Sequence, residues 1–326
     1  MQNEMNTLYV MLGNECNLHC RYCVQRNLIE HPIARRISPK FWKFFMSIKD
    51  NVRVVFYGGE PLLYFPAIKE IVTRRPNLSY HMPSNCKLLT DDMVDFFNKY
   101  DFHISVSWDG DTSYYTRGYD AFAENGDTIR KLKNFAIAST ITKYSPLGNV
   151  FKSIHNEFPD GKRYSIVNLI MDNGLDDKSL IDINTTQLSN DVKDVLKAYD
   201  DGTINENEKD WVNRELHWAK IHTISPYEGA KCGNGRFVIN IDLDGNFYNC
   251  HNLSTPSSYS KDWDKCVDRQ HSERCRNCKV FYFCFGGCPI TTDKDLKRYC
   301  ENAKALYGPI VDWFIQKEVT SAKTQL

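Results

Sequence analysis

The sequence lacks an excess of charge, a long apolar run and an export signal. Its 326 residues carry 41 basic and 41 acidic side chains, so it shows no electrostatic footprint for nucleic acid. No apolar stretch is long enough to span a bilayer. The N-terminal run MQNEMNTLYVML contains an acidic residue and lacks the basic and apolar regions of a signal peptide. These absences predict a cytoplasmic protein without nucleic-acid or membrane partners.

Cysteine, in contrast, is abundant. The chain has 12 cysteines, and in a reducing compartment such a number indicates metal or iron–sulfur sites more than disulfides. No internal repeat or low-complexity linker divides the sequence. The length suits one large domain and one smaller domain, and we expect them at residues 1–225 and 226–326.

Strand-like runs alternate with helical patterns over the first two-thirds of the chain. We expect strands at 7–12, 52–57, 78–83, 103–108, 136–142 and 164–170. Ser38, Thr90 and Asp127 are predicted N-caps of intervening helices. Further helices are expected at 147–158 and, in two parts, between 182 and 222. This alternation predicts an α/β fold with a parallel sheet, whose active site lies at the C-terminal ends of the strands.

The run CNLHCRYC places Cys16, Cys20 and Cys23 directly after the first expected strand. Four-iron clusters normally take four thiolates, so a cluster held by this loop would keep one iron open to a small molecule. A zinc site or scattered buried thiols are the alternatives, but zinc sites favour paired C-x2-C knuckles or His ligands, and no other zinc-like pair lies near these three cysteines. The spacing therefore favours an iron–sulfur site with an open iron.

Each of the next three expected strands ends in a short polar or glycine-containing turn. The turns are Tyr57-Gly58-Gly59-Glu60-Pro61, Ser84-Asn85-Cys86 and Ser107-Trp108-Asp109-Gly110, and Arg117 follows the last. Paired glycines let a backbone approach a ligand closely, and Glu60 offers an acceptor beside it. Each motif alone is typical of an ordinary turn. Their shared place at one edge of the sheet makes them candidate binding residues.

The cysteine loop, with Tyr22 before its third cysteine, and these strand ends together resemble the radical S-adenosylmethionine (SAM) superfamily. The resemblance implies a partial (β/α)6 barrel of the TIM type. It also implies a [4Fe-4S] cluster whose open iron binds SAM, which is then cleaved to a 5′-deoxyadenosyl radical. Ser107 would contact the SAM carboxylate, and the Gly-Gly-Glu segment its amino group. The implied cofactor-binding residues are Tyr57, Gly58, Gly59, Glu60, Asn85, Ser107, Asp109 and Arg117. Of these, Asn85, Asp109 and Arg117 would line or brace the pocket.

The C-terminal part carries a second set of cysteines. Asp244-Gly245 predicts a β-hairpin that lies between Cys232 and Cys250. The remaining members are Cys275, Cys278, Cys284, Cys288 and Cys300. The pattern resembles the SPASM extension of peptide-modifying radical SAM enzymes, which implies two auxiliary [4Fe-4S] clusters and three clusters in all. By that resemblance the outer cluster would be held by Cys275, Cys278, Cys284 and Cys300, and the inner one by Cys232, Cys250 and Cys288.

The inner cluster would then be one thiolate short. Either Cys266 is its fourth ligand, or one iron is open to a substrate atom. Cys86, also outside the pattern, is expected to be a buried apolar thiol. His251 occupies the position of an Asp base in sulfatase-maturing relatives, and histidine accepts a proton near neutral pH. His251 and Cys266 are therefore the candidate catalytic residues.

The resemblance implies an enzyme that abstracts hydrogen from a peptide or protein substrate, as in cross-linking or epimerisation of ribosomal peptides. The alternatives are a formylglycine-generating sulfatase maturase, a radical enzyme for a small metabolite and a non-catalytic iron–sulfur carrier. An open iron argues against the last. The electron would come from a low-potential donor such as flavodoxin or ferredoxin. Because the first strand begins near Thr7, we expect a separate leader-binding protein or direct docking of the precursor peptide.

Overall fold

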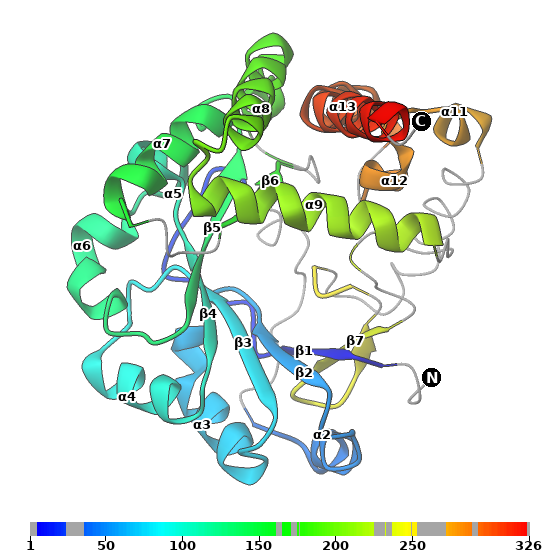
Figure 1. Ribbon diagram of the computed structural model, residues 1–326. Coiled ribbons are helices and arrows are strands. Elements are labelled where there is room, and N and C mark those ends of the chain that lie inside the picture. Colours follow the sequence, from blue (N-terminus) through cyan, green and yellow to red (C-terminus); the bar gives the residue numbers. More distant parts are fainter. Residues whose placement is uncertain are drawn as a thin grey trace.

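Figure 1 shows the fold of the chain in a computed structural model. The structure describes residues 5–23, 36–160, 165–170, 175, 177–224, 232, 237–248, 250–252, 272–288 and 293–324. Cys266 lies outside the described residues, so its part in the inner cluster stays a prediction.

One eight-stranded sheet, in the order β6-β5-β4-β3-β2-β1-β7-β8, organises the structure. Strands β1 to β6 are parallel neighbours, and each coincides within one or two residues with an expected strand. Their bounds are β1 (Thr7–Met11), β2 (Arg53–Tyr57), β3 (Ser79–Ser84), β4 (His103–Ser107), β5 (Phe135–Ile141) and β6 (Ser165–Leu169). The predicted α/β fold with a parallel sheet is confirmed, and its strands end at a common edge.

Helices lie along the outer side of this sheet (Figure 1). They are α2 (Pro39–Phe45), α3 (Phe65–Arg74), α4 (Asp91–Lys99), α5 (Ser113–Arg117), α6 (Ala121–Ile129), α7 (Leu147–Glu157), α8 (Thr185–Asp200) and α9 (Glu206–Ile224). Short 3-10 turns add η1 (Pro61–Tyr64), η2 (Gly110–Thr112) and η3 (Lys178–Ile181). The C-terminal part contributes α11 (Glu273–Arg276), α12 (Phe281–Cys284) and α13 (Asp293–Thr324). Among the described residues, no helix has the length and apolarity needed to cross a membrane.

Two of the three predicted N-caps are confirmed. The Ser38 hydroxyl accepts a hydrogen bond from the amide of Phe41 at 3.1 Å, and the Thr90 hydroxyl accepts one at 3.4 Å. The prediction for Asp127 is wrong, because this residue lies inside α6. Asp120 caps that helix and accepts from two first-turn amides at 3.0 Å each. The helix starts earlier than expected because it continues through a non-helical residue, Asn125.

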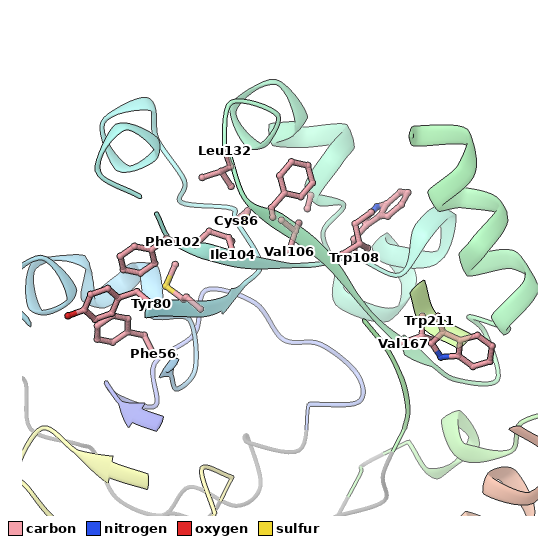
Figure 2. Close-up of a cluster of buried hydrophobic side chains, with 14 of the residues drawn as sticks. Phe56, Tyr80, Cys86, Phe102, Ile104, Val106, Trp108, Leu132, Val167 and Trp211 are labelled. Carbon is pink, nitrogen blue, oxygen red and sulfur yellow. The ribbon is translucent and has the colours of Figure 1, made fainter. Parts of the chain in front are cut away.

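The main core lies between the sheet and its helices. Figure 2 shows buried side chains of this core, among them Phe56 of β2, Tyr80 of β3 and Phe102 just before β4, whose rings stack. Cys86 lies in the same core and is fully buried, as predicted. Successive side chains of a strand point to opposite faces. The partly exposed residues that alternate with this core, including Tyr57 and Ser107, therefore face the inside of the curved sheet.

The C-terminal hairpin consists of β7 (Val238–Asp242) and β8 (Phe247–Tyr248). The predicted Asp244-Gly245 turn is confirmed, with Gly245 at φ +83°. Unexpectedly, β7 pairs in parallel with β1, so that Asn240 lies opposite Tyr9. The domain boundary near residue 225 remains a prediction. The strands beyond it extend the same sheet and bring the C-terminal segment beside the first strand.

Candidate functional site

The three N-terminal cysteines lie on one loop that follows β1 at the C-terminal edge of the sheet. Cys16 is exposed, and Cys20 and Cys23 are partly buried. In the described part of the chain, no group of three His, Cys, Asp or Glu side chains is placed closely enough to hold a metal ion. The loop nevertheless offers three thiols, with His19 between the first two, and three thiols suit an iron–sulfur cluster. Burial raises the pKa of Cys20 to about 11, and the nearby guanidinium of Arg117 opposes that rise.

The end of β2 is joined to the start of the cysteine loop through backbone hydrogen bonds. The Gly59 amide donates to the Gly13 carbonyl and the Glu60 amide to the Glu15 carbonyl, each at 2.9 Å. A Cβ on Gly59 would lie 2.2 Å from the Glu15 oxygen, and one on Gly58 would lie 2.3 Å from the Gly13 oxygen. The two glycines therefore permit contact between two protein backbones. The Gly-Gly-Glu segment and the cysteine loop form one unit.

Glu60 is buried and uses its carboxylate inside the protein. It accepts hydrogen bonds from the Leu62 amide at 3.0 Å, the Ser84 hydroxyl at 2.7 Å and the Asn85 amide at 2.9 Å. Burial raises the pKa of Glu60, and these hydrogen bonds oppose the rise. Glu60 thus ties the end of β2 to the end of β3.

The end of β3 also reaches the cysteine loop. The Asn85 side chain donates to the Asn17 side chain at 2.8 Å. Cys86 adopts a left-handed conformation, with φ +58°, and the side chain of Asn125 donates to its carbonyl at 2.8 Å. Sequence reasoning missed both Asn17 and Asn125. The only local signal for Asn125 was a glycine directly after it inside a helical pattern.

Asp109 and Arg117 form a buried ion pair at the end of β4. Two guanidinium nitrogens of Arg117 donate to Asp109, each at 2.9 Å. The hydroxyls of Tyr22 and Thr116 donate to the same carboxylate at 2.5 and 2.7 Å. The structure therefore brings Asp109 and Arg117 together as a brace for the loop.

Ser107 differs from its neighbours at the end of β4. It is partly buried, and within the described part of the chain its hydroxyl makes no hydrogen bond. The adjacent Trp108 is turned into the core and donates from its indole to Asp120 at 2.9 Å. The Ser107 hydroxyl is thus available to a ligand inside the sheet.

Tyr57, expected as a cofactor-binding residue, lies between the two groups of cysteines. Its hydroxyl donates to the Asn252 side chain at 3.1 Å. Burial is the main cause that raises its pKa above the ordinary value, and Tyr9, Cys250 and Cys23 add to the rise. Because both thiols act on the same phenol, the strand end beside the cysteine loop is also a neighbour of the C-terminal centre.

His251 packs between two aromatic rings. It stacks on Tyr9 with ring centroids 4.2 Å apart and contacts the Tyr57 ring edge-on at 4.4 Å. Its Nδ1 atom is inaccessible and has no hydrogen-bond partner among the residues that the structure describes. Burial lowers the pKa of His251 to about 4, so the imidazole is neutral near pH 7.

The C-terminal cysteines occupy two places. Burial raises the pKa of Cys250 to about 12 and Cys232 adds to the rise, so these two thiols are neighbours. The others lie on α11, between α11 and α12, on α12, after α12 and on α13; they are, in that order, Cys275, Cys278, Cys284, Cys288 and Cys300. Burial raises the pKa of Cys300. The charge of Arg274 opposes this rise, and the thiols of Cys275 and Cys278 add to it. The division of these thiols between two clusters remains a prediction.

No family model matches the chain. The radical SAM cyclopropyl synthase TigE of Paramaledivibacter caminithermalis is 20% identical over 234 residues, which cover 62% of this chain and 48% of that protein. A cysteine-type anaerobic sulfatase-maturating enzyme of Clostridium novyi is 26% identical over 131 residues, which cover 33% of each protein. An uncharacterised protein of Methanocaldococcus jannaschii is 26% identical over 116 residues, 34% of this chain and 41% of that one. The chain thus matches less than half the length of these relatives.

Solved structures match over a larger share of the chain. Native anSMEcpe with bound AdoMet superposes with a TM-score of 0.68 at 16% identity, covering 98% of this chain and 100% of the other. Streptococcus suis SuiB, solved with its precursor peptide SuiA, superposes with a TM-score of 0.54 at 14% identity, covering 88% and 72%. These matches confirm the expected fold. In sequence and in fold, the chain resembles radical SAM enzymes, among them a cyclopropyl synthase and sulfatase-maturating enzymes, as the cysteine loop predicted.

Proposed function

We propose that this chain is a radical SAM enzyme that cleaves SAM reductively and abstracts a hydrogen atom from a peptide or protein substrate. The observation that carries the proposal is the joining of the cysteine loop to the Gly-Gly-Glu segment through Gly59 and Glu60. Radical SAM and sulfatase-maturating relatives support the chemistry. Two solved neighbours, one with AdoMet and a peptide bound and one with a precursor peptide, support a peptide substrate.

Cys16, Cys20 and Cys23 would hold a [4Fe-4S] cluster with one open iron. When bound, the cluster and SAM supply a 5′-deoxyadenosyl radical. The chain's own part is to bind and orient. The segment Gly58, Gly59 and Glu60 would accept hydrogen bonds from the amino group of SAM. The Ser107 hydroxyl, which has no partner among the described residues, would donate one to the SAM carboxylate. The buried bonds around Glu60 hold these strand ends in place before the ligand arrives.

The C-terminal thiols would hold two auxiliary [4Fe-4S] clusters, one of them near Tyr9 and Tyr57. His251 is the proposed acceptor for a substrate proton because of its position directly after Cys250. Burial lowers its pKa to about 4 and encloses its Nδ1, so it is a weaker base here than an ordinary histidine. For the inner cluster the two alternatives stay open: Cys266 is its fourth ligand, or one iron is open to a substrate atom. A low-potential donor such as flavodoxin or ferredoxin would supply the electron. The precursor peptide would be presented by a separate leader-binding protein or would dock directly. The 12 cysteines suit a reducing, cytoplasmic setting.

Formylglycine formation on a sulfatase is the second candidate. It is favoured by matches to cysteine-type and serine-type anaerobic sulfatase-maturating enzymes. The histidine at position 251, packed between Tyr9 and Tyr57, is the feature that separates this chain from that reaction. A small-metabolite substrate has no comparable support.

The test is SAM cleavage by the anaerobically reconstituted, reduced protein. We expect 5′-deoxyadenosine from the wild type, and none when Cys16, Cys20 and Cys23 are all replaced by Ala. Cys86→Ala is the matched control, because Cys86 is buried in the core and belongs to neither cysteine group. Undiminished cleavage in the triple variant would contradict the proposal. A synthetic peptide that acquires a mass change only with active enzyme would identify the substrate class.

A further inference from the structure

We infer that Asp109, Arg117 and Tyr22 are positioning residues that hold the cysteine loop and set the charge environment of Cys20. The inference rests on the proposed function, because it concerns the cluster that this loop would hold. Asp109 and Arg117 were expected to line or brace the SAM pocket, and the inference assigns Asp109 to the support of the cysteine loop.

The first argument is that Asp109 has no capacity left for a ligand. A carboxylate offers about four lone-pair sites. The side chain of Asp109 accepts the hydroxyls of Tyr22 and Thr116, two nitrogens of Arg117 and, at 2.9 Å, the Thr140 amide. Its side chain is also fully buried, with 0% exposure. A group in this state supports its neighbours and does not bind SAM.

The second argument is the place of Tyr22 in the chain. It lies between two thiols of the loop, and its hydroxyl reaches Asp109 at 2.5 Å across 87 residues of sequence. The preceding residue, Arg21, donates its amide to the Thr116 carbonyl at 2.8 Å and pairs with Asp177 at 3.2 Å. Two consecutive residues between Cys20 and Cys23 are thus fixed to the ends of other elements. Outer partners of this kind orient metal ligands.

The third argument is electrostatic. Arg117 is buried beside the loop, with 9% of its side chain exposed, and its charge acts on Cys20 in opposition to that of Asp109. The two charges oppose each other, and the effect of Arg117 is the larger. Interactions between buried charges are screened weakly, so loss of either partner would leave the other acting alone on the cluster. Addition of an electron would be favoured by a lone Arg117 and disfavoured by a lone Asp109.

The decisive experiment is a redox titration of the reconstituted full-length protein, followed by electron paramagnetic resonance. The relevant signal is the component that changes when SAM is added, which separates this cluster from the auxiliary ones. We expect Asp109→Asn to raise the reduction potential and Arg117→Gln to lower it. A purely structural brace would give shifts of the same sign, or none, and that result would overturn the inference.

If a charge variant fails to fold, two milder variants test the inference in its place. Tyr22→Phe keeps the ring and removes one donor to Asp109, so the potential should fall by less than in Arg117→Gln, and iron should be lost faster to a chelator. Tyr80→Phe is the matched control, because it loses a buried hydrogen bond of 2.6 Å to the Arg75 carbonyl far along the sequence from the loop. Equal behaviour of the two variants would refute the inference.

The two proposals fail in different ways. A wild-type protein with neither a SAM-responsive signal nor 5′-deoxyadenosine would overturn the proposed function. A wild-type protein that shows both, with unshifted variants, would overturn the inference about Asp109, Arg117 and Tyr22 and leave the proposed function standing.

Discussion

The two cysteine-rich centres are held by different kinds of structure. The N-terminal loop is bonded to the end of β2 through backbone amides, to the end of β3 through the Asn85 side chain and to the end of β4 through the buried carboxylate of Asp109. Cys275 and Cys284 lie on two helices of 4 residues each, Cys278 lies between these helices, and Phe285 follows in a left-handed conformation at φ +53°. Helices this short are not stable by themselves in water. The first centre therefore inherits its shape from the sheet, whereas the second depends more on its metal.

The largest expected effect distinguishes the two centres by their iron. With all three [4Fe-4S] clusters present we expect about twelve irons per chain. Replacing Cys16, Cys20 and Cys23 by Ala should lower this to about eight, because the C-terminal thiols are untouched. Anaerobic iron and sulfide analysis measures both values. About four irons per chain in the wild type would show that the auxiliary clusters are absent. Zinc bound by the C-terminal cysteines would show that the SPASM interpretation is wrong.

Metal removal should affect the structure of the two centres to different extents. Metal binding is part of the folding free energy of small cysteine-rich segments. In chelator-treated protein, we expect amide hydrogen exchange to rise strongly at 272–288 and to change little in β2 to β4. Exchange measured by mass spectrometry, with the reconstituted protein as the reference, tests this. Equal loss of protection in both regions would show that the sheet does not hold its centre alone.

Gly59→Ala sharpens the comparison within the first centre. The new Cβ would lie 2.2 Å from the Glu15 carbonyl oxygen, so the strand end and the cysteine loop must separate. We expect a loss of about 3 kcal/mol in unfolding free energy, the upper part of the range for overpacking. Gly118→Ala is the control, because Gly118 has φ +73° but open space around its Cβ, and should cost about 1 kcal/mol. Denaturant unfolding ranks the two, and equal losses would contradict the close approach.

The smallest effect concerns the opposite end of the strands. His81 stacks on His103 with ring centroids 4.6 Å apart, and burial, His103 and Arg53 lower the pKa of His81 from 6.5 to about 4. The unfolded chain therefore binds this proton first, and stability falls as the pH drops from about 6.5 towards 4. Thermal unfolding should show a weaker decline in His81→Asn than in the wild type. An unchanged pH dependence would rule out this histidine as the cause.

Much of the fold was accessible from local sequence patterns. The period of the apolar residues in β1 to β6 and the caps Ser38 and Thr90 depend on neighbours along the chain, and they were predicted. The start of α6 was not, because Asp120 and Asp127 offer equivalent side chains and only the packed helix selects between them. The pairing of β7 with β1 joins segments more than two hundred residues apart, for which a single sequence carries no signal.

The candidate site divides in the same way. The sequence by itself determined which thiols follow β1 and which polar residues follow β2, β3 and β4, because parallel strands bring their ends to one edge. Only the tertiary structure decided what those residues do there. The carboxylates of Glu60 and Asp109 accept hydrogen bonds from protein partners, the Ser107 hydroxyl has no partner among the described residues, and the Tyr57 phenol lies near Cys23 and Cys250. The physical reason is that hydrogen-bond saturation and burial depend on atoms brought together by folding, which residue type and spacing do not specify.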